Sequence, residues 1–345
     1  MDPVKCIEGI WETGAFVDLQ VNGFAGVDYN SPLSSNEEIA KSIRTMFSTG
    51  VTRFFPTVIT GDPETMCAAL RNLERAREST REGRAIAGFH VEGPHISVED
   101  GPRGAHPKQW VRRPDSDEFR RWQDACHGNV RLVTLAPEWP EAPAYIEQLV
   151  RDGVVISIGH TRASAAQIRD AVSAGATLST HLGNGADASL PRHPNYIWDQ
   201  LAEDRLSASF IVDGLHLSES FLRVAVRAKS IDRTILVTDA VMPAMCAPGY
   251  YMLGEVAVEL KADQRVVLRG GTRLAGSSLR MDRAVANVIR MADVPLEGAI
   301  LMATLNPARI ARLEPRKDTI RFQWNDGQLD VLETYIEGEY VYRKP

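Results

Sequence analysis

Long hydrophobic runs are missing from this sequence. None of its apolar stretches approaches the roughly 20 residues that a membrane-spanning helix needs. The first ten residues, MDPVKCIEGI, also lack the apolar core of a secretory signal. The pattern therefore predicts neither a membrane protein nor a secreted protein.

Cysteine is scarce as well. The four cysteines, Cys6, Cys67, Cys126 and Cys246, are scattered along the chain and form no Cys-x-x-Cys pair. We expect them to be reduced thiols in a cytoplasmic protein. A chain of 345 residues can bury a core that is stable without disulfides.

The chain has no excess of positive charge and no low-complexity segment. Its formal net charge of −6 argues against a general nucleic-acid-binding surface. An anionic substrate could still bind, but only through a local cluster of hydrogen-bond donors. The length fits one large α/β domain with a small satellite.

What the sequence does contain is a repeated alternation of short apolar stretches and helical patterns. Eight stretches, most of them rich in Val, Ile, Thr or Phe, are typical of strands buried on both faces. They are residues 16–21, 53–57, 85–91, 130–135, 154–158, 176–180, 206–212 and 234–238. The clearest helical patterns lie at 36–48, 63–81, 163–174 and 218–228, whereas 190–204 is ambiguous.

Eight strands that alternate with helices predict a (β/α)8 barrel. A doubly wound open sheet is the alternative, but it usually has fewer strands and a glycine-rich first turn, which this sequence lacks. Asp62 and Pro63 are suited to begin the second helix, and Gly175 is suited to end the helix at 163–174.

Two further stretches alternate like β-hairpins and do not fit the barrel rhythm. Residues 250–269 have a turn signal at Ala262-Asp263, and residues 322–343 have one at Asp326-Gly327. Together they predict a small antiparallel layer beside the barrel. We therefore expect a catalytic barrel at 13–312 with a hairpin insertion near 249–270, and a small β satellite domain formed by 1–12 and 313–345.

Polar side chains gather at the carboxyl ends of the predicted strands, where barrel enzymes place their chemistry. Glu92 ends the third strand, His160 the fifth and His181 the sixth. A buried carboxylate needs a positive partner, and Glu, His and His suit a hydrolytic Zn²⁺ site with an open position for water. We interpret them as ligands of a divalent cation. Ordinary hydrogen-bonded or ion-paired side chains are the alternative.

Two other strand ends bear on the chemistry. Asp239 ends the eighth strand, where it could act as an acid or base, although an aspartate in this position can also be a helix cap. Many metal-dependent barrel hydrolases carry a His-x-His pair on the first strand for a second ion. Here Gln20 and Asn22 occupy those places, and neutral amides are poor ligands for such a cation. The sequence therefore predicts one metal ion, with the two amides engaged in simple hydrogen bonds.

A series of motifs resembles the amidohydrolase superfamily and, within it, the N-acetylglucosamine-6-phosphate deacetylases. The series spans about residues 13–309 and is more specific than any single motif. In order, the motifs are GAFVDLQVNGFAGVDYN, GFHVEGPH, RGAH, LAPE, IGHTRAS, THLGN, VDGLH, LVTDA, LAGSSLRMD and ATLNPAR.

The resemblance implies a TIM barrel of the metal-dependent amidohydrolase type and a role for each matching residue. Glu92, His160 and His181 match the metal ligands, and Asp239 matches the catalytic acid and base. His106, in RGAH, matches the histidine that polarises the scissile carbonyl. The implied cofactor is one divalent ion, Zn²⁺ in the first place, with Fe²⁺, Co²⁺ or Mn²⁺ as alternatives.

The resemblance also implies substrate contacts. Asn184 and Gly185 match the loop that receives the phosphate, and His216 matches a histidine that contacts the sugar. Arg192 matches an arginine that reaches the phosphate from the neighbouring subunit of a homodimer, with a solvated loop as the alternative. The loop GNGADASLPRHPNYIWDQ departs from the common family pattern, and the strands that usually precede the barrel are nearly absent.

The implied reaction is hydrolysis of the acetamide of N-acetylglucosamine-6-phosphate to glucosamine-6-phosphate and acetate, in cytoplasmic amino sugar metabolism. One alternative is a deacetylase of an unphosphorylated N-acetyl sugar or another N-acyl compound. Another is a different amidohydrolase reaction, such as deamination or cyclic-amide opening. A metal-free barrel that senses sugars is the third, and the intact set of strand-end residues argues against it. No nucleic acid or membrane partner is expected.

Overall fold

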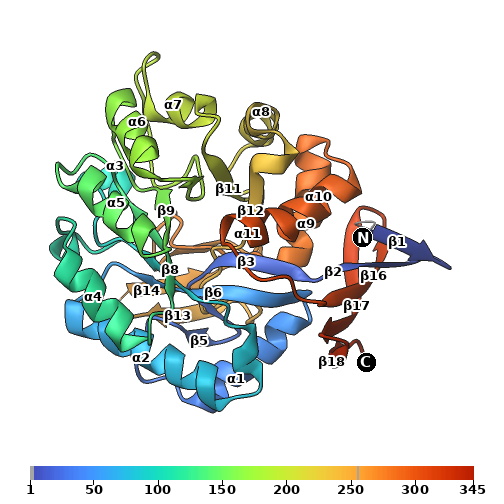
Figure 1. Cartoon of the computed structure of the whole chain (residues 1–345). Coiled ribbons are helices and arrows are strands. Elements are labelled where there is room, and N and C mark those ends of the chain that lie inside the picture. Colours follow the sequence, from blue (N-terminus) through green and yellow to red (C-terminus); the bar gives the residue numbers. More distant parts are fainter. Residues whose placement is uncertain (1–3, 255) are drawn as a thin grey trace.

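The computed structural model, which describes residues 4–254 and 256–345, has at its centre a sheet of eight parallel strands (Figure 1). The strands are β3 (Phe16–Val21), β6 (Val51–Ile59), β7 (Phe89–Glu92), β8 (Val130–Leu135), β9 (Val155–Ile158), β10 (Leu178–Ser179), β11 (Ser207–Ile211) and β12 (Thr234–Val237). A parallel bridge between Val21 and Ala240 brings the last strand back to the first. The predicted (β/α)8 barrel is confirmed.

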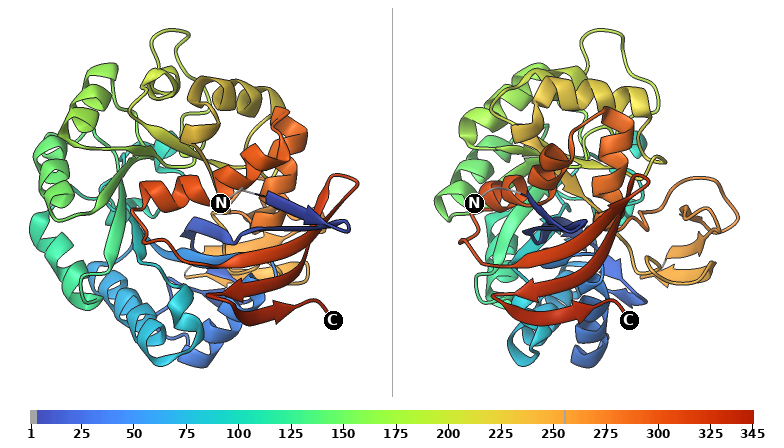
Figure 2. Two further views of the ribbon diagram at one scale, coloured as in Figure 1. Left: turned by 45° about the vertical axis from the view of Figure 1, so that its right-hand side comes forward. Right: turned by 90° about the vertical axis from the view of Figure 1, so that its right-hand side faces the viewer.

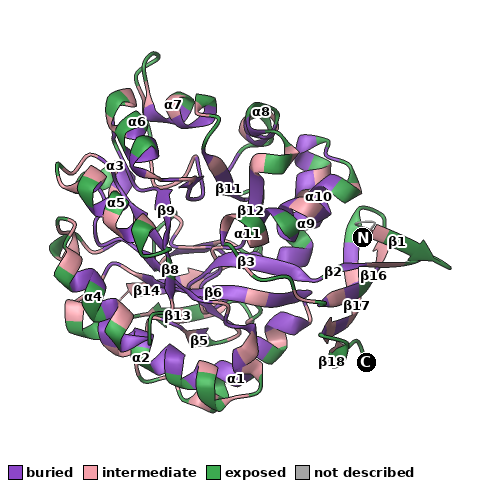
Figure 3. Ribbon diagram, in the orientation of Figure 1, coloured by how far each residue is buried: buried purple, intermediate pink, exposed green. Residues whose placement is uncertain are grey.

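Each predicted strand is present. The strands at 16–21 and 130–135 have the predicted bounds, and the other six have shifted ends. The third begins at Phe89 instead of residue 85, because Glu82–Ala85 form a short 3-10 helix, η1. A short ribbon, β4 (Gly23–Phe24) and β5 (Val27–Asp28), follows the first barrel strand. The barrel strands β3, β9 and β12 (Figure 3), and likewise β7, are buried along their whole length, as is typical of parallel strands that are covered on both faces.

Helices cover the outside of the barrel (Figures 1 and 2). They are α1 (Asn36–Phe47), α2 (Pro63–Ser79), α4 (Ser116–Ala125), α5 (Ala142–Arg151), α6 (Ala165–Ala174), α7 (Tyr196–Ala202), α8 (Glu219–Lys229), α9 (Met281–Ala292), α10 (Leu296–Ala303) and α11 (Leu305–Ile310). The short α3 (Asp100–Arg103) and η2 (Lys108–Trp110) lie between β7 and α4, and η3 (Ile231–Arg233) precedes β12. Among the described residues, no helix is long and apolar enough to cross a membrane.

The helix ends predicted from capping residues are confirmed. The side chain of Asp62 accepts hydrogen bonds from the backbone N–H groups of Glu64 and Thr65 at the start of α2. Gly175 ends α6 in the left-handed region, with φ 114°, which glycine adopts without strain. All four cysteines are free.

The predicted satellite is a five-stranded antiparallel sheet that contains both ends of the described chain (Figure 2). Its strands, in spatial order, are β1 (Val4–Ile7), β2 (Ile10–Gly14), β16 (Thr319–Asn325), β17 (Gln328–Ile336) and β18 (Glu339–Arg343). The predicted turn at Asp326-Gly327 joins β16 to β17, and both residues have positive φ angles, 49° and 73°, as a tight hairpin turn requires.

The prediction for residues 250–269 is wrong in two respects. The stretch forms three strands, β13 (Gly249–Leu253), β14 (Val256–Leu260) and β15 (Val266–Leu268), so Ala262-Asp263 joins only the last two; Glu255 lies outside the described residues. These strands also form a sheet of their own, which projects from the barrel apart from the C-terminal sheet (Figure 2). The reason is packing, because Val258, Leu260 and Val266 bury their side chains in a separate small apolar cluster.

Candidate metal centre and active site

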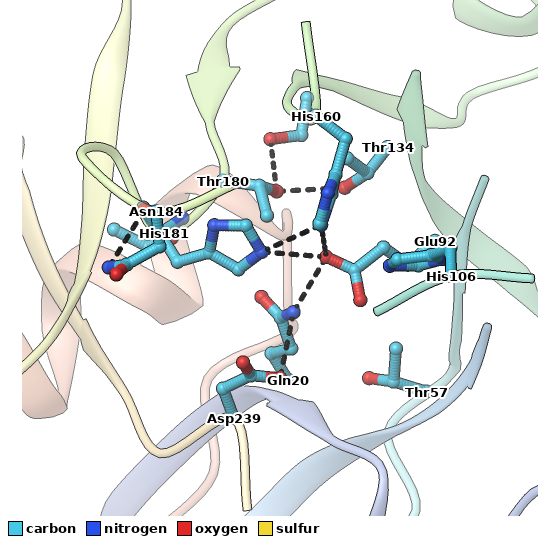
Figure 4. Close-up of polar contacts among 12 residues, drawn as sticks. Gln20, Thr57, Glu92, His106, Thr134, His160, Thr180, His181, Asn184 and Asp239 are labelled. Carbon is cyan, nitrogen blue, oxygen red and sulfur yellow. Dashed lines mark hydrogen bonds and ion pairs between the residues drawn. The ribbon is translucent and has the colours of Figure 1, made fainter. Parts of the chain in front are cut away.

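Glu92, His160 and His181 converge at the carboxyl ends of their strands (Figure 4). Glu92 Oε1 lies 3.2 Å from His160 Nε2 and 2.9 Å from His181 Nε2, and the two Nε2 atoms are 3.1 Å apart. A tetrahedral Zn²⁺ site with bonds of about 2.0–2.1 Å separates neighbouring ligand atoms by roughly 3.3 Å. The three atoms therefore have nearly the spacing that one cation requires.

The protonation of these groups also fits a cation. His160 Nδ1 donates to the Pro102 carbonyl at 2.8 Å, which leaves Nε2 as the ring atom that can offer a lone pair to a cation. Burial alone would raise the pKa of Glu92, but the two imidazoles facing it hold this pKa well below its usual value. An ionised carboxylate that is 3% exposed needs a positive partner, and a divalent cation bound by all three side chains would supply it.

His106 is the fourth side chain close to this point. Ligand atoms of Glu92, His106 and His160 lie within 4.8 Å of one another, so His106 is an alternative third ligand. The set with His181 is tighter, and it better matches the spacing around one cation. We therefore keep His181 as the third ligand.

Its hydrogen bond gives His106 a different chemical role. His106 Nδ1 lies 2.8 Å from Thr60 Oγ1, whereas that hydroxyl is 3.5 Å from the Glu92 carbonyl. A hydroxyl can donate as well as accept, and a proton donated from Thr60 to Nδ1 would leave the ring proton of His106 on Nε2. Burial lowers the pKa of His106 to about 3, which keeps the ring neutral. His106 is thus a neutral hydrogen-bond donor beside the candidate metal centre.

The two amides on the first barrel strand, Gln20 and Asn22, donate hydrogen bonds to the carboxylates of the site. Gln20 Nε2 donates to Glu92 Oε1 at 2.9 Å and to Asp239 Oδ1 at 3.1 Å, and Asn22 Nδ2 donates to the same Asp239 oxygen at 2.6 Å. Both amides therefore hold one oxygen of Asp239, while no described residue forms a hydrogen bond with Oδ2. Burial, with the nearby charge of Glu92, raises the pKa of Asp239 to about 6.

Three of the site residues have an uncommon backbone conformation. His160, His181 and Asp239 have φ angles of 51°, 29° and 48°, in the left-handed region that few residues other than glycine adopt. Such conformations cost free energy and cluster at functional sites. Here they occur directly after β9 and β10 and near the end of β12, at the mouth of the barrel.

Three of the expected substrate-binding residues, Asn184, Gly185 and His216, lie in loops that follow the barrel strands, and each is held by different contacts. Asn184 turns back on its own loop, because its backbone N–H and its Nδ2 both bond to the His181 carbonyl, at 2.9 and 3.4 Å. Gly185 has φ 55°, and a Cβ there would lie 2.7 Å from His160 Nδ1. His216 Nδ1 lies 2.6 Å from Asp213 Oδ2.

His216 and Arg192 differ in their relation to the centre. His216 lies in the loop after β11, the strand next to β12 in the sheet, and Asp239 lies just beyond the end of β12. Arg192 is exposed on the loop before α7, which projects from the barrel (Figure 2). No described residue pairs with its guanidinium, so the single chain does not bring Arg192 to the other site residues.

Comparison with known proteins identifies relatives of this chain. The amidohydrolase family matches residues 13–323. N-acetylglucosamine-6-phosphate deacetylase of Homo sapiens is 36% identical, over 95% of this chain and 82% of the human protein. N-acetylgalactosamine-6-phosphate deacetylase of Shewanella sp. (strain ANA-3) is 34% identical, over 95% of this chain and 82% of its own length.

A solved structure extends the likeness to the fold. A mutant of N-acetyl-D-glucosamine-6-phosphate deacetylase from Mycobacterium smegmatis, in complex with N-acetyl-D-glucosamine-6-phosphate, superposes with a TM-score of 0.87 at 30% identity. The match covers 96% of this chain and 86% of that one. The chain therefore belongs to the amidohydrolase family and, within it, to the branch of the N-acetylglucosamine-6-phosphate deacetylases.

Proposed function

We propose that the chain hydrolyses the acetamide of N-acetylglucosamine-6-phosphate and releases acetate and glucosamine-6-phosphate. Membership in the amidohydrolase family makes it a hydrolase that acts on a carbon–nitrogen bond. The observation that carries the proposal is the convergence of Glu92, His160 and His181 within 3.2 Å of one another, with Asp239 hydrogen-bonded to the same Gln20 amide as Glu92.

One divalent cation would be held by Glu92, His160 and His181. The mixed nitrogen and oxygen donor set favours Zn²⁺, with Fe²⁺, Co²⁺ and Mn²⁺ as the other candidates. When bound, such a cation lowers the pKa of a water molecule towards ~7 and polarises a carbonyl group. Gln20 and Asn22 support a single ion, because their N–H groups face the carboxylates where a second ion would need electron pairs.

Asp239 would move the proton. Two amides fix its Oδ1, which leaves Oδ2 to accept a proton from the attacking water and to return it to the departing amine. A pKa of about 6 suits both steps, because the group is mostly ionised at neutral pH and still basic enough to hold a proton briefly. His106 would donate its Nε2 proton to the oxyanion that develops on the carbonyl.

Recognition of the phosphate would fall to Asn184, the backbone of Gly185 and Arg192. Because Arg192 lies on a projecting loop away from its own centre, we propose a homodimer in which it reaches the neighbouring active site. His216, in the loop after β11, would contact the sugar. The scattered free cysteines support a cytoplasmic location.

A second candidate substrate is N-acetylgalactosamine-6-phosphate. It is favoured by the Shewanella relative, which bears the name of that activity and is 34% identical over 95% of this chain. The two sugars differ only in the orientation of one hydroxyl group, so both would present the same acetamide and the same phosphate to the site.

Acetate release tests the proposal. N-acetylglucosamine-6-phosphate, its galacto epimer and unphosphorylated N-acetylglucosamine are offered separately to the metal-loaded protein. The highest kcat/KM is expected for the first substrate. A higher value for the galacto epimer moves the assignment to the second candidate, and a higher value for the unphosphorylated sugar contradicts phosphate recognition. His181→Ala is the control for contaminating activity.

A further inference from the structure

Arg162, Asp187 and Tyr196 form a network that the proposed reaction does not use. Arg162 Nε donates to Asp187 Oδ2 at 2.9 Å, and its Nη2 contacts Oδ1, so the pair is bidentate. The Tyr196 hydroxyl, on a side chain that is only 6% exposed, donates to Asp187 Oδ2 at 2.9 Å and accepts the Asp187 backbone N–H at 2.7 Å. Bidentate pairs of this kind fix direction as well as distance.

The pair connects two loops that each begin at a candidate metal ligand. Arg162 follows His160 by two residues, in the loop after β9, and Asp187 follows His181 by six residues, in the loop after β10. The first loop is itself held from β8, because Glu138 accepts the Arg162 backbone N–H at 3.1 Å.

A third loop, which follows β7 and Glu92, meets the same carboxylate. A Cβ at Gly101 would lie 2.6 Å from Asp187 Oδ1 and 2.9 Å from its Cα, so the two backbones are in close contact. Arg162 Nη1 is also 3.4 Å from Glu99 Oε2. The loops after all three ligand-bearing strands therefore meet at Asp187.

Asp187 stands two residues beyond Gly185, in the loop whose sequence departs from the family pattern. The inner end of this loop is set by the close packing of Gly185 on His160. Its outer end is set by Asp187. We infer that the Arg162–Asp187 pair is a positioning element that holds Asn184 and Gly185 where the substrate's phosphate binds. This inference rests on the proposed function and adds to it two residues outside the catalytic set.

The experiment compares Asp187→Asn, Arg162→Ala and Arg162→Lys with the wild-type protein, using kcat and KM for the phosphorylated and unphosphorylated N-acetyl sugars. Metal content and Tm are measured in parallel. Arg205→Ala is the matched control, because Arg205 also forms a bidentate pair, with Glu203, through two 2.9 Å contacts, but it precedes β11 at the opposite end of the barrel.

Loss of the pair is expected to raise KM for the phosphorylated sugar by about 10-fold, with kcat within about 2-fold of wild type and bound metal unchanged. The unphosphorylated sugar should be little affected. Arg162→Lys should recover part of the loss, because it keeps the charge but not the two-pronged geometry. Arg205→Ala should behave as wild type.

Three results would overturn the inference. An unchanged KM for the phosphorylated sugar shows that the Arg162–Asp187 pair does not position the residues that bind the phosphate. Equal losses on both sugars, or loss of metal, show a purely structural role. A lower KM in Asp187→Asn shows that Arg162 binds phosphate itself once released. If the wild-type protein has no preference for the phosphorylated sugar, the proposed function fails together with the inference.

Discussion

At the scale of the residue, the site is organised around one carboxylate that neutral groups hold in place. Asp239 receives two amide N–H groups on one oxygen, and neither donor carries a charge that would cancel its basicity. From the sequence, Gln20 and Asn22 are expected only to form simple hydrogen bonds in the barrel mouth. Nothing in a linear sequence shows which carboxylate an amide will face. The same holds for the Pro102 carbonyl, which accepts a hydrogen bond from His160 Nδ1, and for the Thr60 hydroxyl, which contacts His106 Nδ1.

Asp239→Asn tests the proton transfer. The substitution keeps the shape of the side chain but removes its basicity, so kcat should fall by at least the ~10²–10⁴ typical of general acid–base groups. The metal and the fold should be retained. Turnover at the wild-type rate by a metal-loaded Asp239→Asn protein would reduce Asp239 to a structural residue.

The pH dependence of kcat/KM tests the amides. Activity requires ionised Asp239, so kcat/KM should fall as the pH drops through the pKa of this group. The hydrogen bond from Asn22 stabilises the ionised form and lowers that pKa. Asn22→Ala should therefore raise the pKa and move the acid limb of the profile to higher pH. A limb that stays in place, or moves to lower pH, would contradict this role.

At the scale of the element, the sequence predicts the barrel well because buried strands and capped helices are local patterns. Each candidate ligand could be anticipated because a polar residue that ends an apolar strand is visible in the sequence. The sheet of β13, β14 and β15 could not be placed, because its position depends on packing against its own small cluster. The Arg162–Asp187 pair joins loops whose approach only the closed barrel brings about.

Gly185 gives a prediction at this scale. Gly185→Ala would place a methyl group 2.7 Å from His160 Nδ1, so we expect weaker metal binding, measured by titration of the metal-free protein. Gly153→Ala is the control. Gly153 also has a positive φ, 84°, but a Cβ there meets nothing within 4 Å. It should cost about 1–2 kcal/mol of stability without changing metal affinity. Equal metal affinities for the two variants would contradict the steric argument.

At the scale of the whole molecule, the candidate metal centre lies in the barrel, whereas the five-stranded sheet and the loop with Arg192 lie outside it. We propose the division into a barrel at 13–312 and a satellite of 1–12 and 313–345, of which residues 1–3 lie outside the described structure. The five-stranded sheet of this satellite joins the two ends of the described chain. The guanidinium of Arg192 has no partner within the described part of the chain, and a homodimer would give it one. Oligomeric assembly is the level that a single sequence predicts least directly, because the contact lies between two molecules.

Arg192→Ala tests the assembly. A charge-assisted contact with phosphate contributes about 1.5–3 kcal/mol, so KM for the phosphorylated sugar should rise roughly 10–100-fold. Mixed dimers of Arg192→Ala and His181→Ala chains should regain activity, because one of their two sites then has both an intact metal centre and an intact arginine. Mixed dimers as inactive as the separate variants would place Arg192 outside the neighbouring site.

The central claim is a single-metal centre built by Glu92, His160 and His181, and a titration tests it most directly. Metal-free protein receives Zn²⁺ in steps while bound metal and acetate release are both followed. Both signals should saturate at one equivalent per chain in the wild type, and tight binding should be lost in His160→Ala and in His181→Ala. Saturation at two equivalents, or full activity without metal, would contradict the account.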